Sequence, residues 1–392
     1  MPGGYLELVA IIGLYTGLVL WPPRRPRALA AAVYFVSHPV NELPGLALIA
    51  LLAGTALAVA ASGMASASGL TVLALAALTA LALLEVIRRG LMTASVVERS
   101  LDEGLGRGWR SLAGTADRPR WHRLARALLA PLPLRPLSVQ RLRNVSYGEA
   151  GRRNRLDVYR RRGPTGGAGP VFVHFHGGHF QVGGKNREAR ALLHRLARQG
   201  WVCVSATYRL GQAGRFPNAL IDAKQVISWV RSHAAEYGAA PSTLIVAGSS
   251  AGAHLASMAA LTPNHPAFQP AFEDADTTVT AAVCLYGYYG DHDGAGPLAS
   301  SPEAYASHGA PPFLVAHGDK DPLIPIGHAD HFVQRLRGCS VRPVVYLRLP
   351  GAGHSFDLFH SPRFEAVIDG IQAFAAWARV NQDKHSPNGA PS

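Results

Sequence analysis

The first 87 residues of this 392-residue chain carry only six charged side chains, and this limits the possible folds more than any other feature. Three apolar stretches of 17 or 18 residues lie there, at 5–21, 44–61 and 70–87. A helix needs about 20 apolar residues to cross the hydrocarbon core of a bilayer. We therefore predict a transmembrane helical region over residues 1–90, with spans at about these positions. The alternative is an Ala- and Leu-rich helical bundle buried inside a soluble protein.

The basic residues beside these stretches predict their orientation. Three Arg residues follow the first stretch, and Arg88 and Arg89 follow the third, whereas the link 62–69 is uncharged. Because cytoplasmic loops carry the excess of Lys and Arg, both basic flanks are expected in the cytoplasm. The first stretch has no small-residue cleavage site before its flank, which favours a retained span over a signal peptide. Whether the region has two spans or three, we expect a multi-pass membrane protein whose C-terminal domain lies on the cytoplasmic side.

The net charge of +13 is concentrated directly after the apolar region. Residues 88–162 contain 18 Arg against six acidic side chains, whereas residues 163–392 are nearly balanced. A basic segment beside membrane spans favours anionic lipid head groups as its partner. The sequence has no zinc-finger or RNA-binding motif, so nucleic acid is not an expected partner. We predict a basic connector or partial cap over residues 91–143 and a disordered tail over residues 381–392.

Short apolar runs alternate with longer amphipathic runs over residues 144–380, the predicted catalytic domain. The expected strands are 144–149, 156–160, 171–175, 202–206, 243–247, 281–286, 313–316 and 343–349. The expected helices are 187–199, 218–237, 251–261, 327–337 and 363–380. Strands that alternate with helices predict a mostly parallel sheet with helices on both faces.

A Gly-x-Ser-x-Gly pattern at 248–252 joins an expected strand to an expected helix. In this context the pattern is typical of a nucleophile elbow, a sharp turn that exposes the serine hydroxyl above the edge of the sheet. We therefore predict Ser250 as a nucleophile. The free N–H of Ala251, at the start of the helix, is expected to stabilise a negative oxygen in the transition state.

A second motif, His176-Gly177-Gly178-His179, follows the expected strand 171–175. Small residues let backbone N–H groups approach an oxyanion, so Gly177, Gly178 and His179 are the predicted partners of the Ala251 N–H. The alternative is metal ligation by the three histidines at 174, 176 and 179. No carboxylate cluster lies near them in sequence, and none of the three cysteines has a metal-ligand spacing, so we expect neither a metal nor another cofactor.

Two further loops supply an acid and a base. Asp319 and Asp321 follow the expected strand 313–316, and His354 follows 343–349 in a Gly-rich loop. Asp321, beside Pro322, is the predicted acid and Asp319 the alternative. The order Ser, Asp, His along the chain is that of α/β-hydrolases, and each residue follows the strand that this fold requires.

With these motifs in view, the region 144–380 resembles α/β-hydrolases of the hormone-sensitive-lipase-like esterase group. The resemblance covers about 60% of the chain and includes Tyr208-Arg209-Leu210, Phe216-Pro217 and Gly353-His354. It implies a serine carboxylesterase or lipase that cleaves small-molecule or lipid esters through an acyl-enzyme on Ser250. His179 stands where this group has a third glycine, a feature of feruloyl-esterase-like, kynurenine-formamidase-like and isoprenylcysteine-methylesterase-like relatives.

Three alternatives to a carboxylesterase remain open at this point. The same triad serves amide or formamide hydrolysis, and it serves acyl transfer to an alcohol other than water. A non-catalytic membrane interaction protein with a degenerate hydrolase domain is the third. Membrane lipids are an expected partner, and the sequence gives no oligomeric state.

Overall fold

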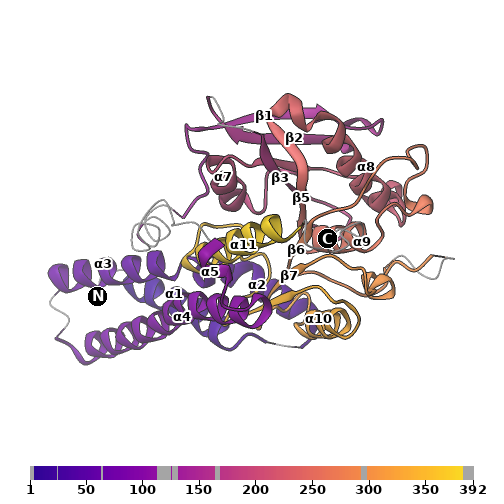
Figure 1. The fold of residues 1–392 in the computed structure, drawn as a ribbon. Helices are drawn as coiled ribbons and strands as arrows, with labels where there is room; N and C mark the ends of the chain where they lie inside the picture. The colour runs from indigo at the N-terminus through magenta and orange to yellow at the C-terminus, as the bar shows by residue number, and fades with distance from the viewer. Residues whose placement is uncertain are drawn as a thin grey trace.

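A computed structural model describes residues 4–23, 25–62, 65–112, 125, 131–163, 168–292 and 298–382 (Figure 1). Its centre is one eight-stranded sheet in the order β1-β2-β4-β3-β5-β6-β7-β8. The strands are β1 Val139–Ser146, β2 Arg155–Arg161, β3 Gly169–Phe175, β4 Val202–Ala206, β5 Ala239–Ser249, β6 Ala281–Leu285, β7 Phe313–Gly318 and β8 Val344–Leu349. β2 runs antiparallel to both of its neighbours, and all the other pairs are parallel. The predicted mostly parallel sheet is confirmed.

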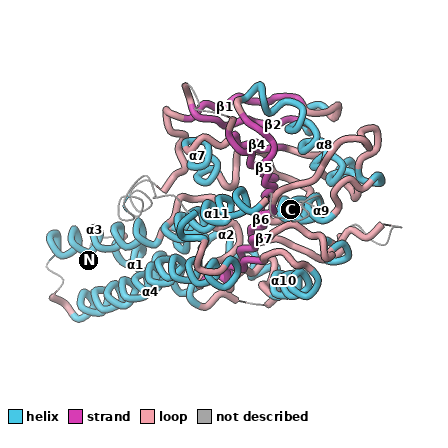
Figure 2. The backbone as a smooth tube through the Cα atoms, viewed as in Figure 1, coloured by secondary structure: helices cyan, strands magenta, loops and turns pink. Residues whose placement is uncertain are grey.

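Helices cover both faces of this sheet, as predicted (Figures 1 and 2). One face carries α7 Arg190–Arg198 and α11 Pro362–Asn381, and the other carries α8 Asn218–His233, α9 Ala251–Leu261 and α10 Gly327–Cys339. The shorter helices are α5 Trp109–Leu112, η1 Gly151–Arg153, η2 Gly211–Gly214, η3 Ala234–Tyr237, η4 Pro266–Phe268 and η5 Pro302–Tyr305. Because both faces are covered, β4 and β6 are buried along their whole length, which explains their continuous apolar sequences.

Four long helices of the described part come before the sheet and pack together beside it: α1 Tyr5–Leu20, α2 Arg27–Glu42, α3 Pro44–Ser62 and α4 Ala67–Leu105 (Figure 1). By length and composition, α3 and α4 are long and apolar enough to cross a membrane, and α1 is a shorter apolar helix. Many large apolar side chains of this group face outwards: Leu6, Ile11, Leu14, Ile49, Leu52, Leu57, Leu70, Leu75, Leu78, Leu81 and Leu84.

Helix α4 joins these helices to the sheet without a break. At 39 residues it is roughly 58 Å long. Its first half packs against α1 and α3, whereas Val97 and Leu101 in its second half are buried in the same apolar core as α11 and β8. The helix thus continues past residue 87, where the predicted third span ends, and past residue 91, where the predicted connector begins. Residues 113–124 and 126–130 of that connector lie outside the described residues.

Two further boundaries differ from the predictions. The first strand begins at Val139, five residues before its predicted start, and its pairing with β2 shifts between Leu142 and Val145, where Asn144 has a left-handed backbone. Helix α2 is not among the predicted helices, and its polar end carries Asn41 and Glu42. The predicted tail begins too early, because α11 continues to residue 381; residues 383–392 lie outside the described part.

Candidate active site

The turn between β5 and α9 presents Ser250 at the carboxyl edge of the sheet. Ser250 has φ 55° and ψ −118°, a strained conformation that few non-glycine residues adopt. Its N–H donates to the carbonyl oxygen of Leu285 on β6 at 2.9 Å, which holds the turn against the sheet. The strained residue is thus the serine at the tip of the strand-to-helix turn, as in a nucleophile elbow.

The two glycines of this turn are required by close packing. A Cβ atom at Gly248 would lie 2.0 Å from the carbonyl oxygen of Gly252. A Cβ atom at Gly252 would lie 2.0 Å from the carbonyl oxygen of Phe175, at the end of β3. Real Cβ atoms do not approach backbone atoms this closely, so strand and helix can meet here only without these side chains.

Ser250, His354 and Asp321 meet at this edge and form one chain of hydrogen bonds. The Nε2 atom of His354 lies 3.0 Å from Oγ of Ser250, and its Nδ1 atom lies 2.7 Å from Oδ2 of Asp321. All three residues are buried. In this arrangement the imidazole can take the hydroxyl proton, and the carboxylate holds the tautomer that leaves Nε2 free to do so.

Asp321 is held ionised by its surroundings. Its Oδ1 atom accepts hydrogen bonds from the N–H groups of Leu323 and Ile324, both at 2.9 Å. Burial alone would raise the pKa of this carboxyl group. The facing rings of His354 and His317, with their hydrogen bonds, outweigh burial and hold that pKa well below its usual range.

Asp319, the alternative acid, has a different contact. Its Oδ1 atom accepts the N–H of Gly351 at 2.8 Å. This hydrogen bond ties the loop after β7 to the loop that carries His354. The carboxylate that faces the imidazole is that of Asp321 and not that of Asp319.

The Gly177-Gly178-His179 loop faces the turn of Ser250, but one of its three predicted N–H donors is occupied. The N–H of Gly177 donates to Oε2 of the buried Glu188 at 2.9 Å, so the prediction of Gly177 as an oxyanion donor is wrong for this structure. Among the described residues, no acceptor is found for the N–H groups of Gly178, His179 or Ala251. These three amides remain as candidates for an oxyanion hole.

The three histidines of the alternative metal site have separate environments. The Nε2 atom of His174 lies 3.0 Å from Oγ of Ser249, and burial lowers the pKa of His174 to about 3. The ring of His176 stacks on Tyr208, and burial lowers the pKa of His176 to about 4. His179 is exposed. In the described ranges, no three His, Cys, Asp or Glu side chains are grouped so that they could hold a metal ion.

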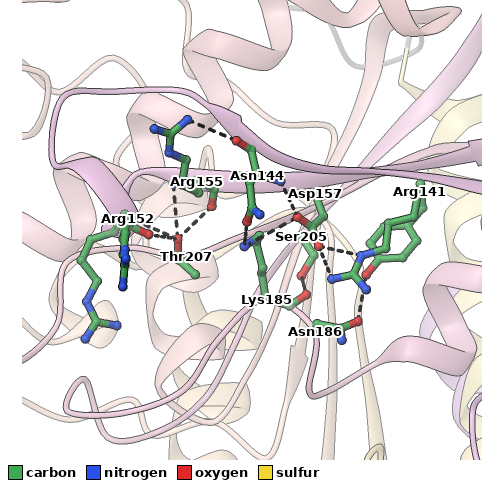
Figure 3. Close-up of polar contacts among 11 residues, drawn as sticks. Arg141, Asn144, Arg152, Arg155, Asp157, Lys185, Asn186, Ser205 and Thr207 are labelled. Carbon is green, nitrogen blue, oxygen red and sulfur yellow. Dashed lines mark hydrogen bonds and ion pairs between the residues drawn. The ribbon is translucent and has the colours of Figure 1, made fainter.

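A polar network around Asp157 on β2 anchors the segment that follows the oxyanion loop (Figure 3). Asp157 is fully buried and accepts from Nε of Arg141 at 2.7 Å and from the N–H of Asn144 at 2.9 Å. Lys185 donates from Nζ to Oδ1 of Asn144 at 2.8 Å, and Ser205 donates to the carbonyl oxygen of Lys185 at 2.8 Å. These bonds join Lys185, in this segment, to β1 and β4, and its ion pair with Asp157 at 3.6 Å joins it to β2.

A buried carboxylate beside the turn of Ser250 lies outside the predicted site. Asp357 accepts from Oγ of Ser249 at 2.7 Å and from the hydroxyl of Tyr286, whose ring centroid lies 4.5 Å from that of His354. Burial raises the pKa of Asp357. Its position three residues after His354 is the only sequence signal for it, and a single acidic residue in a loop is too common to be noticed.

The fold and this site define the class, an α/β-hydrolase with a serine at its nucleophile elbow. The BD-FAE family model matches residues 156–291, and the dienelactone hydrolase family model matches residues 267–382. The solved esterase Est2 of Thermogutta terrifontis with bound butyrate has a TM-score of 0.53 and 22% identity, covering 64% of this chain and 97% of that chain. At this identity the likeness shows the fold.

Sequence relatives narrow the class further. The probable carboxylic ester hydrolase LipM of Mycobacterium tuberculosis is 38% identical over 346 residues, covering 80% of this chain and 79% of LipM. Esterase LipQ of the same organism is 37% identical over 256 residues, covering 59% of this chain and 61% of LipQ. The chain belongs to the family of carboxylic ester hydrolases that includes LipM, and the predicted esterase resemblance is confirmed. The LipM match is too long to fit within residues 91–392, so it extends into the apolar helices.

Proposed function

We propose that this ester hydrolase works through an acyl-enzyme on Ser250, with His354 as base and Asp321 as acid. The observation that carries the proposal is the unbroken hydrogen-bonded chain from Oγ of Ser250 through the imidazole to the carboxylate. His354 takes the hydroxyl proton while Oγ attacks the ester carbonyl carbon, and it then gives this proton to the departing alcohol. Water, deprotonated by His354, attacks the acyl carbon, releases the acid and restores the serine.

The negative oxygen of each tetrahedral intermediate is assigned to the free amides of Gly178, His179 and Ala251. Loss of one such donor typically costs ~2.7–4 kcal/mol of transition-state stabilisation. Gly178 and His179 both have positive φ angles, 122° and 53°. A Cβ atom at Gly178 would lie 1.9 Å from the carbonyl oxygen of Val182, so glycine is required there.

The nucleophile is tested by Ser250→Ala in the full chain. We expect loss of p-nitrophenyl ester hydrolysis and loss of labelling by a fluorophosphonate probe. Ser257→Ala is the matched control, because Ser257 lies on α9, the helix that follows Ser250, and its buried hydroxyl donates to the carbonyl oxygen of Ala253. Wild-type activity in Ser250→Ala would refute the mechanism.

We also propose that α1, α3 and the first half of α4 lie in a membrane, with the catalytic domain on the cytoplasmic side. The outward-facing leucines of these helices and the basic flanks support this placement. Helix α2 is placed at the membrane surface, because it carries Pro39, Asn41 and Glu42 and exposes Phe35 and Val36. Carbonate-washed membranes should retain the chain. A protease should cleave the catalytic domain in inverted vesicles and spare it in intact spheroplasts.

A lipid-like ester is the substrate class that we propose, since a site beside the bilayer meets such esters at high local concentration. Purified full chain in nanodiscs should be given p-nitrophenyl esters of rising acyl length and matched p-nitroanilides. We expect kcat/KM to rise with acyl length and the anilides to react far more slowly. A preference for the anilides would favour the amide-hydrolase alternative, and a preference for acetyl esters would argue against a lipid substrate.

A further inference from the structure

The loop that carries His354 is packed beneath two of the N-terminal helices. The hydroxyl of Tyr34 on α2 donates to the carbonyl oxygen of His354 at 2.6 Å. A Cβ atom at Gly353 would lie 3.2 Å from the Tyr34 ring, and one at Gly351 would lie 2.9 Å from the Arg89 side chain on α4. The backbone of this loop therefore meets α2 and α4 at Gly351, Gly353 and His354.

A buried ion pair fixes the end of α2 on the other side of the same loop. The carboxylate of Glu42 is buried and accepts from Oγ of Ser361 at 2.9 Å and from the guanidinium of Arg363. Arg363 is 2% exposed, and its second amino group lies 3.5 Å from the carbonyl oxygen of Pro350. Removal of one partner from a buried pair is costly, so α2 is held firmly against the start of α11.

His354, which accepts the Tyr34 hydrogen bond, needs an exact position for the proposed reaction. His354 must contact Ser250 and Asp321 at the same time, and a misplacement of about 1 Å can cost roughly 100-fold in rate. Its loop contains Gly351 and Gly353, which give the backbone little stiffness of its own. The loop therefore depends on outside contacts to hold the imidazole in place.

We propose that helix α2 is part of the active site and that Tyr34 positions the histidine base through the backbone carbonyl of His354. The N-terminal helices then set the turnover rate in addition to anchoring the enzyme. This inference rests on the proposed role of His354 as base. Tyr34 touches the backbone of the base and not its imidazole nitrogens, so it is a positioning residue.

The test is Tyr34→Phe in the full chain, purified in mild detergent and assayed with p-nitrophenyl butyrate, a small ester that does not require a bilayer. The concentration of active sites is measured by titration with a fluorophosphonate, and kcat is calculated from this concentration so that unfolded protein is not counted. We expect kcat per site to fall about tenfold, the equivalent of one hydrogen bond, with KM unchanged. The rate of fluorophosphonate labelling should fall by the same factor.

Tyr5→Phe is the matched control, because it removes a hydroxyl from the same group of helices. Tyr5 on α1 donates to Oγ1 of Thr55 on α3 at 2.9 Å, within the helical bundle. We expect wild-type kcat in this variant. Equal kcat in Tyr34→Phe, Tyr5→Phe and wild type would overturn the proposal, and so would an equal loss in both variants.

Gly353→Ala provides a second test that keeps the Tyr34 hydroxyl. The added methyl group would lie 3.2 Å from the Tyr34 ring, so the ring must shift by a few tenths of an ångström, and we expect this shift to lower kcat without changing KM. Gly184→Ala, where a Cβ atom meets nothing within 4 Å, is its control. If Tyr34→Phe gives no folded enzyme, a wild-type kcat in Gly353→Ala overturns the proposal. If Ser250→Ala is inactive while Tyr34→Phe keeps the wild-type kcat, the role of Tyr34 is refuted and the proposed mechanism stands. If Ser250→Ala is active, the proposed mechanism itself is refuted.

Discussion

Ser249, the residue before Ser250, donates its hydroxyl to Asp357 at 2.7 Å, and Asp357 lies three positions after His354. A second buried acid, Glu188, accepts the N–H of Gly177. Burial, together with the negative charge of Asp357, raises the pKa of Glu188 to about 7. Two carboxyl groups thus support the elbow and the oxyanion loop from behind, and their protonation is linked to the stability of both.

Glu188 should make the protein less stable as pH rises from about 4.5 to about 7. In the unfolded chain its carboxyl group ionises near 4.5, whereas in the folded protein it keeps its proton up to about 7. The folded state therefore binds more protons in this window, and raising the pH favours unfolding. Glu188→Gln should remove this decline and raise Tm at pH 8 by about 2–4 °C, the shift expected for ~1 kcal/mol. Thermal unfolding at pH 5–8 measures it.

The control for this measurement is Glu236→Gln, because Glu236 is exposed. That variant should keep the pH dependence of the wild type. If Glu188→Gln showed the same decline in Tm as Glu236→Gln, the buried Glu188 carboxyl group would not be its source.

Asp321→Asn and Asp319→Asn should have very different effects on turnover. Asp321 faces the imidazole and stays ionised over the working pH range, so its amide should favour the wrong tautomer and lower kcat by roughly 10⁴-fold, as reported for such a change in a serine protease triad. An asparagine at 319 can still accept the N–H of Gly351. Steady-state kinetics should give Asp319→Asn a kcat within about threefold of the wild-type value, a change of less than ~1 kcal/mol in the activation free energy. A reversed ranking would make Asp319 the acid.

Helix α4 should stabilise the catalytic domain only through its second half. Leu101 is 1% exposed and packs in the core beneath α11, whereas Leu81 on the same helix is 64% exposed. Leu101→Ala should therefore lower the free energy of unfolding by about 2–5 kcal/mol. Leu81→Ala should leave it nearly unchanged. The two variants are compared by the temperature at which each loses esterase activity in detergent. Equal inactivation temperatures would show that α4 is not part of the core.

The elbow should not accept a methyl group at Gly252. A Cβ atom there would lie 2.0 Å from the carbonyl oxygen of Phe175, so Gly252→Ala must force α9 away from β3. We expect a loss of about 1–3 kcal/mol in stability and a fall in kcat, because Ser250 and the N–H of Ala251 move with the helix. Gly184→Ala, which has open space, should behave as wild type. Unchanged activity in Gly252→Ala would contradict the close packing.

The sequence determined the parallel sheet and the neighbourhood of the site. Ser250, Asp321 and His354 each follow an apolar run, and the carboxyl ends of parallel strands lie along one edge of a sheet, so their order along the chain was enough to bring them together. Periodicity likewise predicted the helices, and α9 has the predicted bounds.

Only the tertiary structure decided which groups support the site. The Glu188 contact that occupies Gly177, the Asp357 contact with Ser249 and the Tyr34 contact with His354 join residues 11, 108 and 320 positions apart. Such contacts leave no periodic pattern, because each needs one polar group at one place. The length of α4 was hidden for a related reason: a helix shows which of its faces is apolar, but only its neighbours decide whether that face meets lipid or a protein core.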